Sequence, residues 1–386
     1  MSAAYWWDQL PEDFYKHSDG TELDRQHWFK VRSTAVADRV LRAGLGSVMG
    51  ASMTPLLVSK KALSDELERL AFYRDFAEKG DVQATFQAPE PVRMRVSKPR
   101  MGHYRPFGIA AEDLSFDSPF VPLNPAMRDR YLGYKRNRVA HAQYWRHPQG
   151  PRRTLIFVHG VIEGWYGLNA IWFALKWFYR RGYDVVQFTL PFHGYRTEPR
   201  HAVSGIGFFS GGFAHINEAM LQGVCDLRVL LDYLYARGAP SVGVSGLSLG
   251  GYHTAMLATA DPRLAFAIPN SPVVAPIDMV LDWEPTGALL RAVMKRSGLS
   301  VRELRRDLAV HSPLTYAPQL DGDRALIIGG AGDRLTSPRF VRLLHQHWQE
   351  SHLHWFPGNH VIHLSQGAYL RRMKNFMDRH TVHPMV

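Results

Sequence analysis

Short apolar runs alternate with longer helical segments from about residue 131 to the end of the chain. The apolar runs predict strands at 139–146, 154–158, 184–190, 241–245, 264–268, 325–328 and 352–356. The spacing of apolar residues predicts helices over 165–179, 218–237, 249–258, 338–348 and 366–377. Strands that alternate with helices form βαβ units around a mainly parallel sheet, and continuous apolar runs suit strands covered on both faces. We therefore predict an α/β fold with a mainly parallel central sheet flanked by helices.

Two segments fall outside this alternation. Residues 1–130 match no part of the core, and their apolar spacing is helical from about residue 23 to residue 79. They predict a mostly helical N-terminal extension that packs on a core of residues 131–386. Residues 273–319 interrupt the core with helical spacing and no strand signal. A connection of this length is uncommon unless it is functional or has structure of its own, so we predict a helical lid.

The composition and the N-terminal region bear on the class and location of the protein. A hydrophobic fraction of 46% and a charged fraction of 21% exclude a wholly disordered chain. The single cysteine, Cys225, excludes an internal disulfide. Residues 1–10 lack the basic and apolar regions of a secretory signal, and the uncharged stretch 43–59 is too short and too interrupted to span a bilayer. We expect a cytoplasmic protein. Peripheral membrane contact stays open, because tryptophans precede the stretch 43–59 and two lysines follow it.

The net charge of +11 raises three classes of partner, namely nucleic acids, anionic membranes and acidic substrates. Much of the excess lies in residues 128–153, where eight Lys or Arg residues stand against the single acid Asp129. We interpret this basic stretch as a solvated face, with anionic lipid headgroups and acyl-CoA phosphates as alternative partners. No helix-turn-helix, zinc-finger or RNP-like signature supports nucleic-acid binding.

The most informative motif is the G-x-S-x-G pentapeptide from Gly246 to Gly250. It follows a predicted strand and begins a predicted helix, the context in which a sharp, strained turn exposes a serine hydroxyl. We expect a Cβ atom at Gly246 or Gly250 to clash with the closely packed strand and helix. The N-terminus of the helix also favours negative charge on an attacked carbonyl oxygen. Ser248 is therefore the candidate nucleophile.

With this motif in this context, the chain from about residue 139 to its end resembles the α/β-hydrolase superfamily. Residues 1–130 loosely resemble the helical leaders of its poorly characterised abhydrolase-domain branch. The resemblance implies an acid and then a histidine after the serine in chain order. Asp333 lies in a glycine-rich turn after the strand at 325–328, where the family places its acid. An Asx turn or a helix cap is its alternative role. His360 follows the last strand, as the family's base does, and His363 is the alternative base.

The resemblance also implies an oxyanion hole built from two backbone N–H groups, those of Leu249 and Val161. Val161 follows His159 and Gly160 at the end of the strand 154–158, a segment similar to the family's HG segment. We expect the side chain of His159 to brace this loop. His193, in the P-x-H-G segment after the next strand, is expected to be structural. The extended HGGG of some lipases and esterases is missing from this segment.

No metal and no cofactor are expected from the sequence. The histidine pairs 345/347 and 352/354 have H-x-H spacing, but no H-E-x-x-H motif and no cysteine pair accompany them. The glycine-rich run 205–212 lacks a P-loop lysine, so it does not predict a phosphate site.

These observations predict a serine hydrolase that cleaves a small-molecule carboxylic ester or thioester through an acyl-enzyme on Ser248. An acyltransferase stays open, because the same acyl-enzyme can pass its acyl group to an alcohol or an amine. Two non-enzymatic classes also stay open, namely a binding protein on a hydrolase fold and a membrane-surface binder that uses the basic stretch. A serine in the pentapeptide argues against the dehalogenase and epoxide-hydrolase mechanisms, which need a carboxylate nucleophile.

Overall fold

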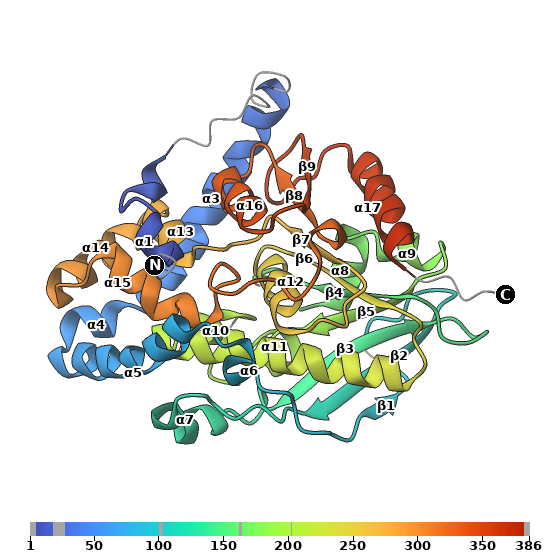
Figure 1. Cartoon of the computed structure of the whole chain (residues 1–386), viewed down its shortest axis with the longest axis horizontal. Helices are drawn as coiled ribbons and strands as arrows, with labels where there is room; N and C mark the ends of the chain where they lie inside the picture. The colour runs from blue at the N-terminus through green and yellow to red at the C-terminus, as the bar shows by residue number, and fades with distance from the viewer. Residues whose placement is uncertain (1–4, 18–27, 100–102, 162–163, 202, 382–386) are drawn as a thin grey trace.

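One sheet of nine strands organises the described part of the chain, which in this computed structural model comprises residues 5–17, 28–99, 103–161, 164–201 and 203–381 (Figure 1). In spatial order the strands are β1 (Arg95–Ser97), β2 (Ala110–Asp117), β3 (Val139–Arg146), β5 (Asp184–Thr189), β4 (Thr154–Val158), β6 (Val242–Leu247), β7 (Ala267–Asn270), β8 (Leu326–Gly330) and β9 (His352–Phe356). Neighbouring strands from β5 to β9 are parallel, whereas β1, β2 and β3 form an antiparallel edge. The predicted mainly parallel sheet is confirmed.

Helices cover both faces of the sheet because successive strand residues point to opposite sides. On one face, Leu155 and Phe157 of β4 pack in a cluster with α8 (Tyr166–Trp172), α9 (Leu175–Tyr179) and α17 (Gln366–His380). On the other face, Ile156 and Val158 pack in a cluster with α11 (Phe213–Ala236), α12 (Leu249–Ala260) and α16 (Pro338–His347). Burial on both faces explains the continuous apolar runs of the inner strands.

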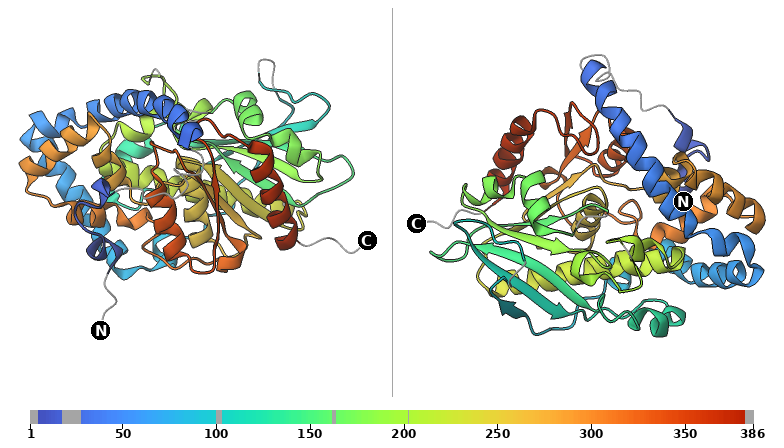
Figure 2. Two further views of the ribbon diagram at one scale, coloured as in Figure 1. Left: turned by 90° about the horizontal axis from the view of Figure 1, so that it is seen from above. Right: turned by 180° about the vertical axis from the view of Figure 1, so that it is seen from behind.

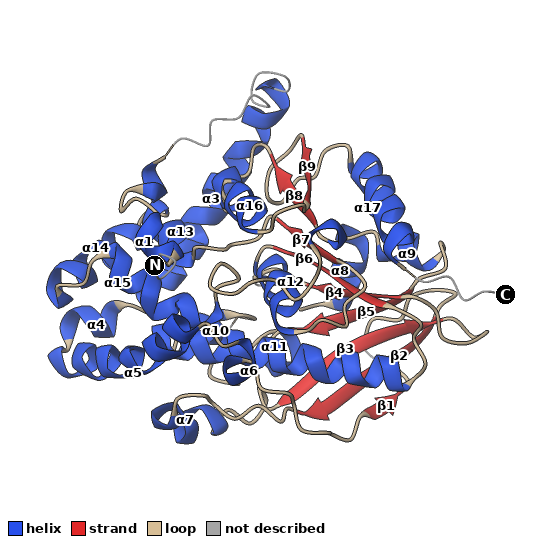
Figure 3. Ribbon diagram, in the orientation of Figure 1, coloured by secondary structure: helices blue, strands red, loops and turns tan. Residues whose placement is uncertain are grey.

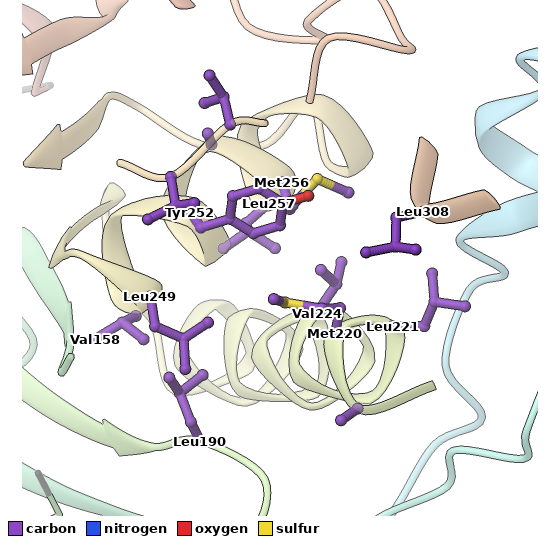
Figure 4. Packing of buried hydrophobic residues seen from close by; sticks show 14 of the residues in the cluster. Val158, Leu190, Met220, Leu221, Val224, Leu249, Tyr252, Met256, Leu257 and Leu308 are labelled. Carbon is purple, nitrogen blue, oxygen red and sulfur yellow. The ribbon is translucent and has the colours of Figure 1, made fainter. Parts of the chain in front are cut away.

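The second cluster fixes α12, which begins directly after Ser248. Figure 4 shows Tyr252 and Met256 of α12 above Met220 and Val224 of α11. Leu249 lies beside Val158 at the end of β4 and Leu190 just after β5. Every residue of α12 is buried. The turn that holds Ser248 is therefore anchored on both sides by close packing, and it has little freedom to relax.

The N-terminal helices and the helices of the insertion gather beside the sheet rather than over it (Figure 3). The N-terminal group comprises α1 (Trp6–Gln9), α3 (Trp28–Ala51), α4 (Thr54–Val58), α5 (Lys60–Lys79) and α6 (Val82–Thr85). The insertion contains α13 (Pro276–Asp282), α14 (Thr286–Ser297) and α15 (Val301–Leu308). Two short helices, α7 (Arg128–Leu132) and α10 (Ile206–Phe209), complete the set of α-helices described.

Contacts join the two groups of helices, and Figure 2 shows α3 lying alongside the insertion in both views. The Thr286 hydroxyl of α14 donates a hydrogen bond to the Gly46 carbonyl of α3. Arg74 of α5 forms an ion pair with Asp307 of α15 at 2.5 Å. The N-terminal segment is therefore tied to the insertion at several points.

The structure differs from the sequence prediction in several places. The strand expected at 264–268 lies at 267–270, and the helix expected over 165–179 is broken at Ala174, whose φ of 51° is left-handed. The sheet also begins before residue 131, where the sequence placed the start of the core, because β2 pairs with β3 over its full length. β2 is a partly exposed strand that contains three acidic residues, so it has no apolar run for the sequence to reveal.

Part of the N-terminal region lies outside the described residues. This holds for residues 1–4 of the stretch considered as a secretory signal and for residues 23–27 of the expected helical region. Among the helices that the structure does describe, none combines the length and the apolar character needed to cross a bilayer.

Candidate active site

Ser248 occupies a strained turn between β6 and α12. Its φ of 58° and ψ of −116° lie in a region that residues other than glycine rarely adopt, and its N–H donates a 2.9 Å hydrogen bond to the Asn270 carbonyl. A Cβ atom built on Gly250 would lie 2.1 Å from the Val158 oxygen, and one on Gly246 would lie 2.4 Å from the Gly250 oxygen. The expectation that both glycines make room for a close strand–helix approach is confirmed.

Asp333 and His360 come together in loops at the ends of neighbouring strands. Asp333 follows β8, His360 follows β9, and Nδ1 of His360 lies 2.7 Å from Oδ2 of Asp333. Both side chains are buried. This hydrogen bond keeps a proton on Nδ1 and turns Nε2 away from the carboxylate, which is the orientation a histidine base requires.

The carboxylate of Asp333 is held by its own loop. Oδ1 accepts hydrogen bonds from the backbone N–H groups of Leu335 at 2.9 Å and Thr336 at 2.8 Å. Burial raises the pKa of Asp333, but the attraction of His360 and the hydrogen bonds from His360 and Thr336 outweigh it, so the pKa lies below its ordinary value. The Asx turn that the sequence offered as an alternative role thus coexists with the contact to His360.

Thr336 is a site residue that the sequence reasoning missed. Its hydroxyl donates to Oδ2 of Asp333 at 2.9 Å and lies 3.1 Å from Nδ1 of His360. A threonine three residues after an aspartate in a glycine-rich turn is a signal that could have revealed it, because hydroxyl side chains close such turns. Thr336 therefore adds a second donor to the carboxylate oxygen that binds His360.

Ser248 and His360 line the same cavity, whose volume is about 910 Å³. Its walls are mostly apolar; α3 with α4, α8, the start of α11 and α13 supply many of the lining residues, and the loops after β4, β8 and β9 and the start of α12 supply others. The lining residues from α3 and the turn after it are Leu41, Leu45, Met49, Ser52 and Met53. No Lys, Arg, Asp or Glu side chain of the described residues lines the cavity, and the basic stretch 128–153 lies outside it.

The two residues predicted to form the oxyanion hole lie beside Ser248. Val161 and Leu249 both line the cavity. A Cβ atom on Gly160 would lie 3.6 Å from the Cβ of Ser248, so the loop that carries Val161 touches the turn that carries the serine. Leu249 is the first residue of α12, where a backbone N–H has no acceptor within the helix.

Three further histidines near the site are engaged elsewhere. Nδ1 of His159 donates to the Gly160 carbonyl at 2.7 Å, and its Nε2 accepts from the Leu190 N–H at 3.1 Å, which confirms its bracing role. Nδ1 of His193 lies 2.7 Å from the Pro191 carbonyl.

His363, the alternative base, lies 3.1 Å from Tyr369 Oη through Nδ1 and 3.1 Å from the His360 carbonyl through Nε2. Burial lowers the pKa of His363 to about 4. The structure thus pairs Asp333 with His360.

A second carboxylate reaches the two loops from the N-terminal segment. Oδ2 of Asp38, a fully buried residue of α3, accepts the N–H of Arg334 at 2.9 Å and the N–H of His360 at 3.0 Å. Burial, followed by repulsion from Asp333, raises the pKa of Asp38 to about 6. The sequence reasoning missed this residue, because nothing near it in the chain distinguishes it from other helical aspartates.

The H-x-H pairs of the sequence do not form a cluster of ligands. His345 Nδ1 lies 2.8 Å from Ser351 Oγ, and His347 Nε2 lies 2.9 Å from the Tyr316 carbonyl. Within the described ranges no group of three His, Cys, Asp or Glu side chains is placed to hold a metal ion.

Comparison with known sequences gives relatives whose functions are not named. No family model matches the chain. Two proteins of Mycobacterium tuberculosis, called uncharacterized protein MT2702 in strain CDC 1551 and uncharacterized protein Rv2627c in strain H37Rv, are each 31% identical to it over 295 residues. The alignment covers 72% of this chain and 65% of either relative, so the chain spans slightly less than two thirds of their length.

Comparison with solved structures identifies the fold. Acetyl xylan esterase 1 from Thermoanaerobacterium sp. matches 79% of this chain and 93% of its own with a TM-score of 0.56 and 14% identity. The acetyl xylan esterase from Paenibacillus sp. R4 matches 83% of this chain and 99% of its own with a TM-score of 0.54 and 16% identity. Together with the mainly parallel sheet and the serine turn between β6 and α12, these similarities show that the chain has the α/β-hydrolase fold.

Proposed function

We propose that this protein is a serine hydrolase that cleaves a carboxylic ester or thioester through an acyl-enzyme on Ser248. One observation carries the proposal: a serine on a strained turn and a histidine paired with a buried aspartate at 2.7 Å line the same cavity. A serine hydroxyl is a weak nucleophile by itself, and it needs an adjacent base that a third group orients.

In the proposed reaction the Ser248 oxygen attacks the acyl carbon while Nε2 of His360 takes the hydroxyl proton. The backbone N–H groups of Val161 and Leu249 stabilise the negative oxygen of the tetrahedral intermediate. Asp333 stabilises the imidazolium, which then returns the proton to the departing alcohol or thiol. Water attacks the acyl-enzyme by the same route, with His360 again taking the proton, and this step releases the acid and regenerates Ser248.

The cavity supports a substrate with a large apolar acyl group. Its volume of about 910 Å³ and its mostly apolar walls without charged side chains favour burial of hydrocarbon and disfavour a charged group. We therefore propose a neutral ester with a medium or long acyl chain as the preferred substrate. A coenzyme A headgroup would have to remain outside the cavity, because no Lys or Arg side chain of the described residues lines it.

Labelling with a fluorophosphonate probe tests the nucleophile. The wild-type protein should react with the probe and hydrolyse p-nitrophenyl esters, whereas Ser248→Ala should do neither. A Ser248→Ala protein that cleaves these esters as fast as wild type, or a wild-type protein that does not react, would exclude the mechanism. Product analysis in the presence of added alcohols and amines separates hydrolysis from acyl transfer.

A further inference from the structure

The N-terminal helix α3 contacts the loops of the proposed triad through a pair of side chains one helical turn apart. Asp38 accepts the backbone N–H of Arg334, and Arg42 donates to the carbonyl of the same residue at 3.4 Å. Arg42 also forms an ion pair at 3.5 Å with Asp282 at the end of α13. Because Arg334 directly follows Asp333, α3 holds the peptide groups on both sides of Arg334, the first of which joins it to the proposed catalytic acid.

The same oxygen of Asp38 also binds the loop of the proposed base. The N–H of His360 donates to Oδ2 of Asp38 at 3.0 Å, across 322 positions of sequence. A single buried oxygen thus joins the acid loop after β8 to the base loop after β9. The distance between Asp333 and His360 depends on how these two loops lie relative to each other.

We propose that Asp38 is a positioning residue for the proposed triad, which holds the loops of Asp333 and His360 together and adds a negative charge near the imidazolium. This inference rests on the proposed function. Burying a carboxylate costs free energy unless it is well bonded, so a charged group at this place needs a compensating role. The positioning role of Asp38 also makes the N-terminal segment part of the proposed active site.

The electrostatic surroundings of Asp38 fit this role. Asp333 and His360 face it from the two loops, and Arg42 lies on the next turn of α3 with its partner Asp282. Burial and then repulsion from Asp333 raise the pKa of Asp38, while the two backbone hydrogen bonds and the attraction to His360 lower it. The attraction between Asp38 and His360 also favours the protonated form of His360, which is the form that builds up during acyl transfer.

Two substitutions in the protein separate the hydrogen bonds from the charge. Asp38→Asn can keep its carbonyl oxygen in the position of Oδ2, so both backbone hydrogen bonds survive and the charge is lost. Asp38→Ala loses the two hydrogen bonds as well as the charge. We expect Asp38→Ala to lower kcat on p-nitrophenyl butyrate and the rate of fluorophosphonate labelling by roughly ten- to a hundredfold, with little change in KM, because small displacements of reacting groups cost that much.

The charge has its own signature in the pH profile. Asp38→Asn should move the acid limb of kcat/KM to lower pH by roughly half a unit, because His360 loses a nearby negative charge. A merely structural residue would not shift this limb. Asp38→Asn also keeps the test decisive if Asp38→Ala does not fold.

A control for the general effect of disturbing a buried carboxylate is available on α11. Glu218 is another buried carboxylate that accepts two backbone N–H groups, those of Leu123 at 2.9 Å and Asn124 at 2.8 Å, and neither of these residues lines the cavity. Glu218→Gln should lower the melting temperature and leave kcat per folded molecule and the pH profile unchanged.

The outcomes distinguish this inference from the proposed function. Wild-type labelling together with an unchanged kcat and pH profile in both Asp38 variants would overturn the positioning role alone. The same losses in Glu218→Gln would also overturn it, because they would show a general effect of disturbing a buried carboxylate. A wild-type protein that neither labels nor hydrolyses esters would overturn the proposed function and this inference with it.

Discussion

Thr336 and His360 share one oxygen of Asp333: the threonine hydroxyl lies 2.9 Å from Oδ2 and the imidazole Nδ1 lies 2.7 Å from it. Thr336→Val removes the hydroxyl at nearly constant shape. We expect kcat to fall about tenfold, because a hydrogen bond to a charged acceptor contributes about 1.5 kcal/mol or more. Thr336→Ser, which retains the hydroxyl, should recover most of the loss. Equal kcat values for Thr336→Val and Thr336→Ser in steady-state kinetics on one ester would contradict a role for the Thr336 hydroxyl.

The contact between Asp333 and His360 predicts a larger loss for the acid itself. Asp333→Asn should lower kcat by about 10³–10⁴-fold, because an amide cannot fix the tautomer or stabilise the imidazolium. Asp321→Asn is a suitable control, since Asp321 is exposed and precedes β8 at the opposite end of the strand. Comparable losses in the two variants would show that Asp333 has no special role.

The apolar cavity predicts a preference for longer acyl chains. Each buried methylene group contributes about 0.8 kcal/mol, so the four that separate octanoyl from butyryl esters should raise kcat/KM about tenfold even if only half of this free energy is realised. Leu45→Trp, which fills space beside α3, should reduce the rate on octanoyl esters more than on acetyl esters. Val40→Trp on the exposed side of the same helix should leave the preference unchanged. A panel that is flat with chain length would contradict the proposed substrate class.

The close approach at Gly250 predicts a large loss of stability on adding a single methyl group. Gly250→Ala places its Cβ 2.1 Å from the Val158 oxygen, so the strand and helix must separate. We expect the free energy of unfolding to fall by about 1–3 kcal/mol or more. At Gly44 on α3 nothing lies within 4 Å of an added Cβ, and Gly44→Ala should stabilise the protein by up to about 1 kcal/mol. Denaturant titration of both variants measures the contrast.

The raised pKa of Asp38 predicts a dependence of stability on pH. Its pKa lies at about 6 in the folded protein against an ordinary value of 3.8, so the folded state holds this proton more tightly than the unfolded state. The stability that it contributes is complete below pH 4 and is lost as the pH rises through 6. Asp38→Asn removes this loss, so its free energy of unfolding should increase relative to wild type by about 2 kcal/mol between pH 4 and pH 7. A constant difference across this range would contradict the prediction.

The parts of the candidate site that the sequence predicted are those whose signals are local. The turn at Ser248 needs glycines at fixed offsets between a strand and a helix, and Asp333 and His360 each follow a strand within a few residues. Asp38 carries no such signal, because its partners lie about three hundred positions away on loops that only the folded sheet brings together. β2 was missed for a different reason, since an edge strand that is partly exposed has no need of an apolar run.

The pairing of β2 with β3 and the position of α3 have a practical consequence for anyone who shortens this protein. A version that starts at residue 131 would expose β3 as a bare sheet edge and remove the wall of the cavity that α3 supplies. Such a piece would present unpaired backbone groups to other chains and would tend to aggregate. Activity assays, fusions and crystallisation trials should therefore keep the N-terminal segment.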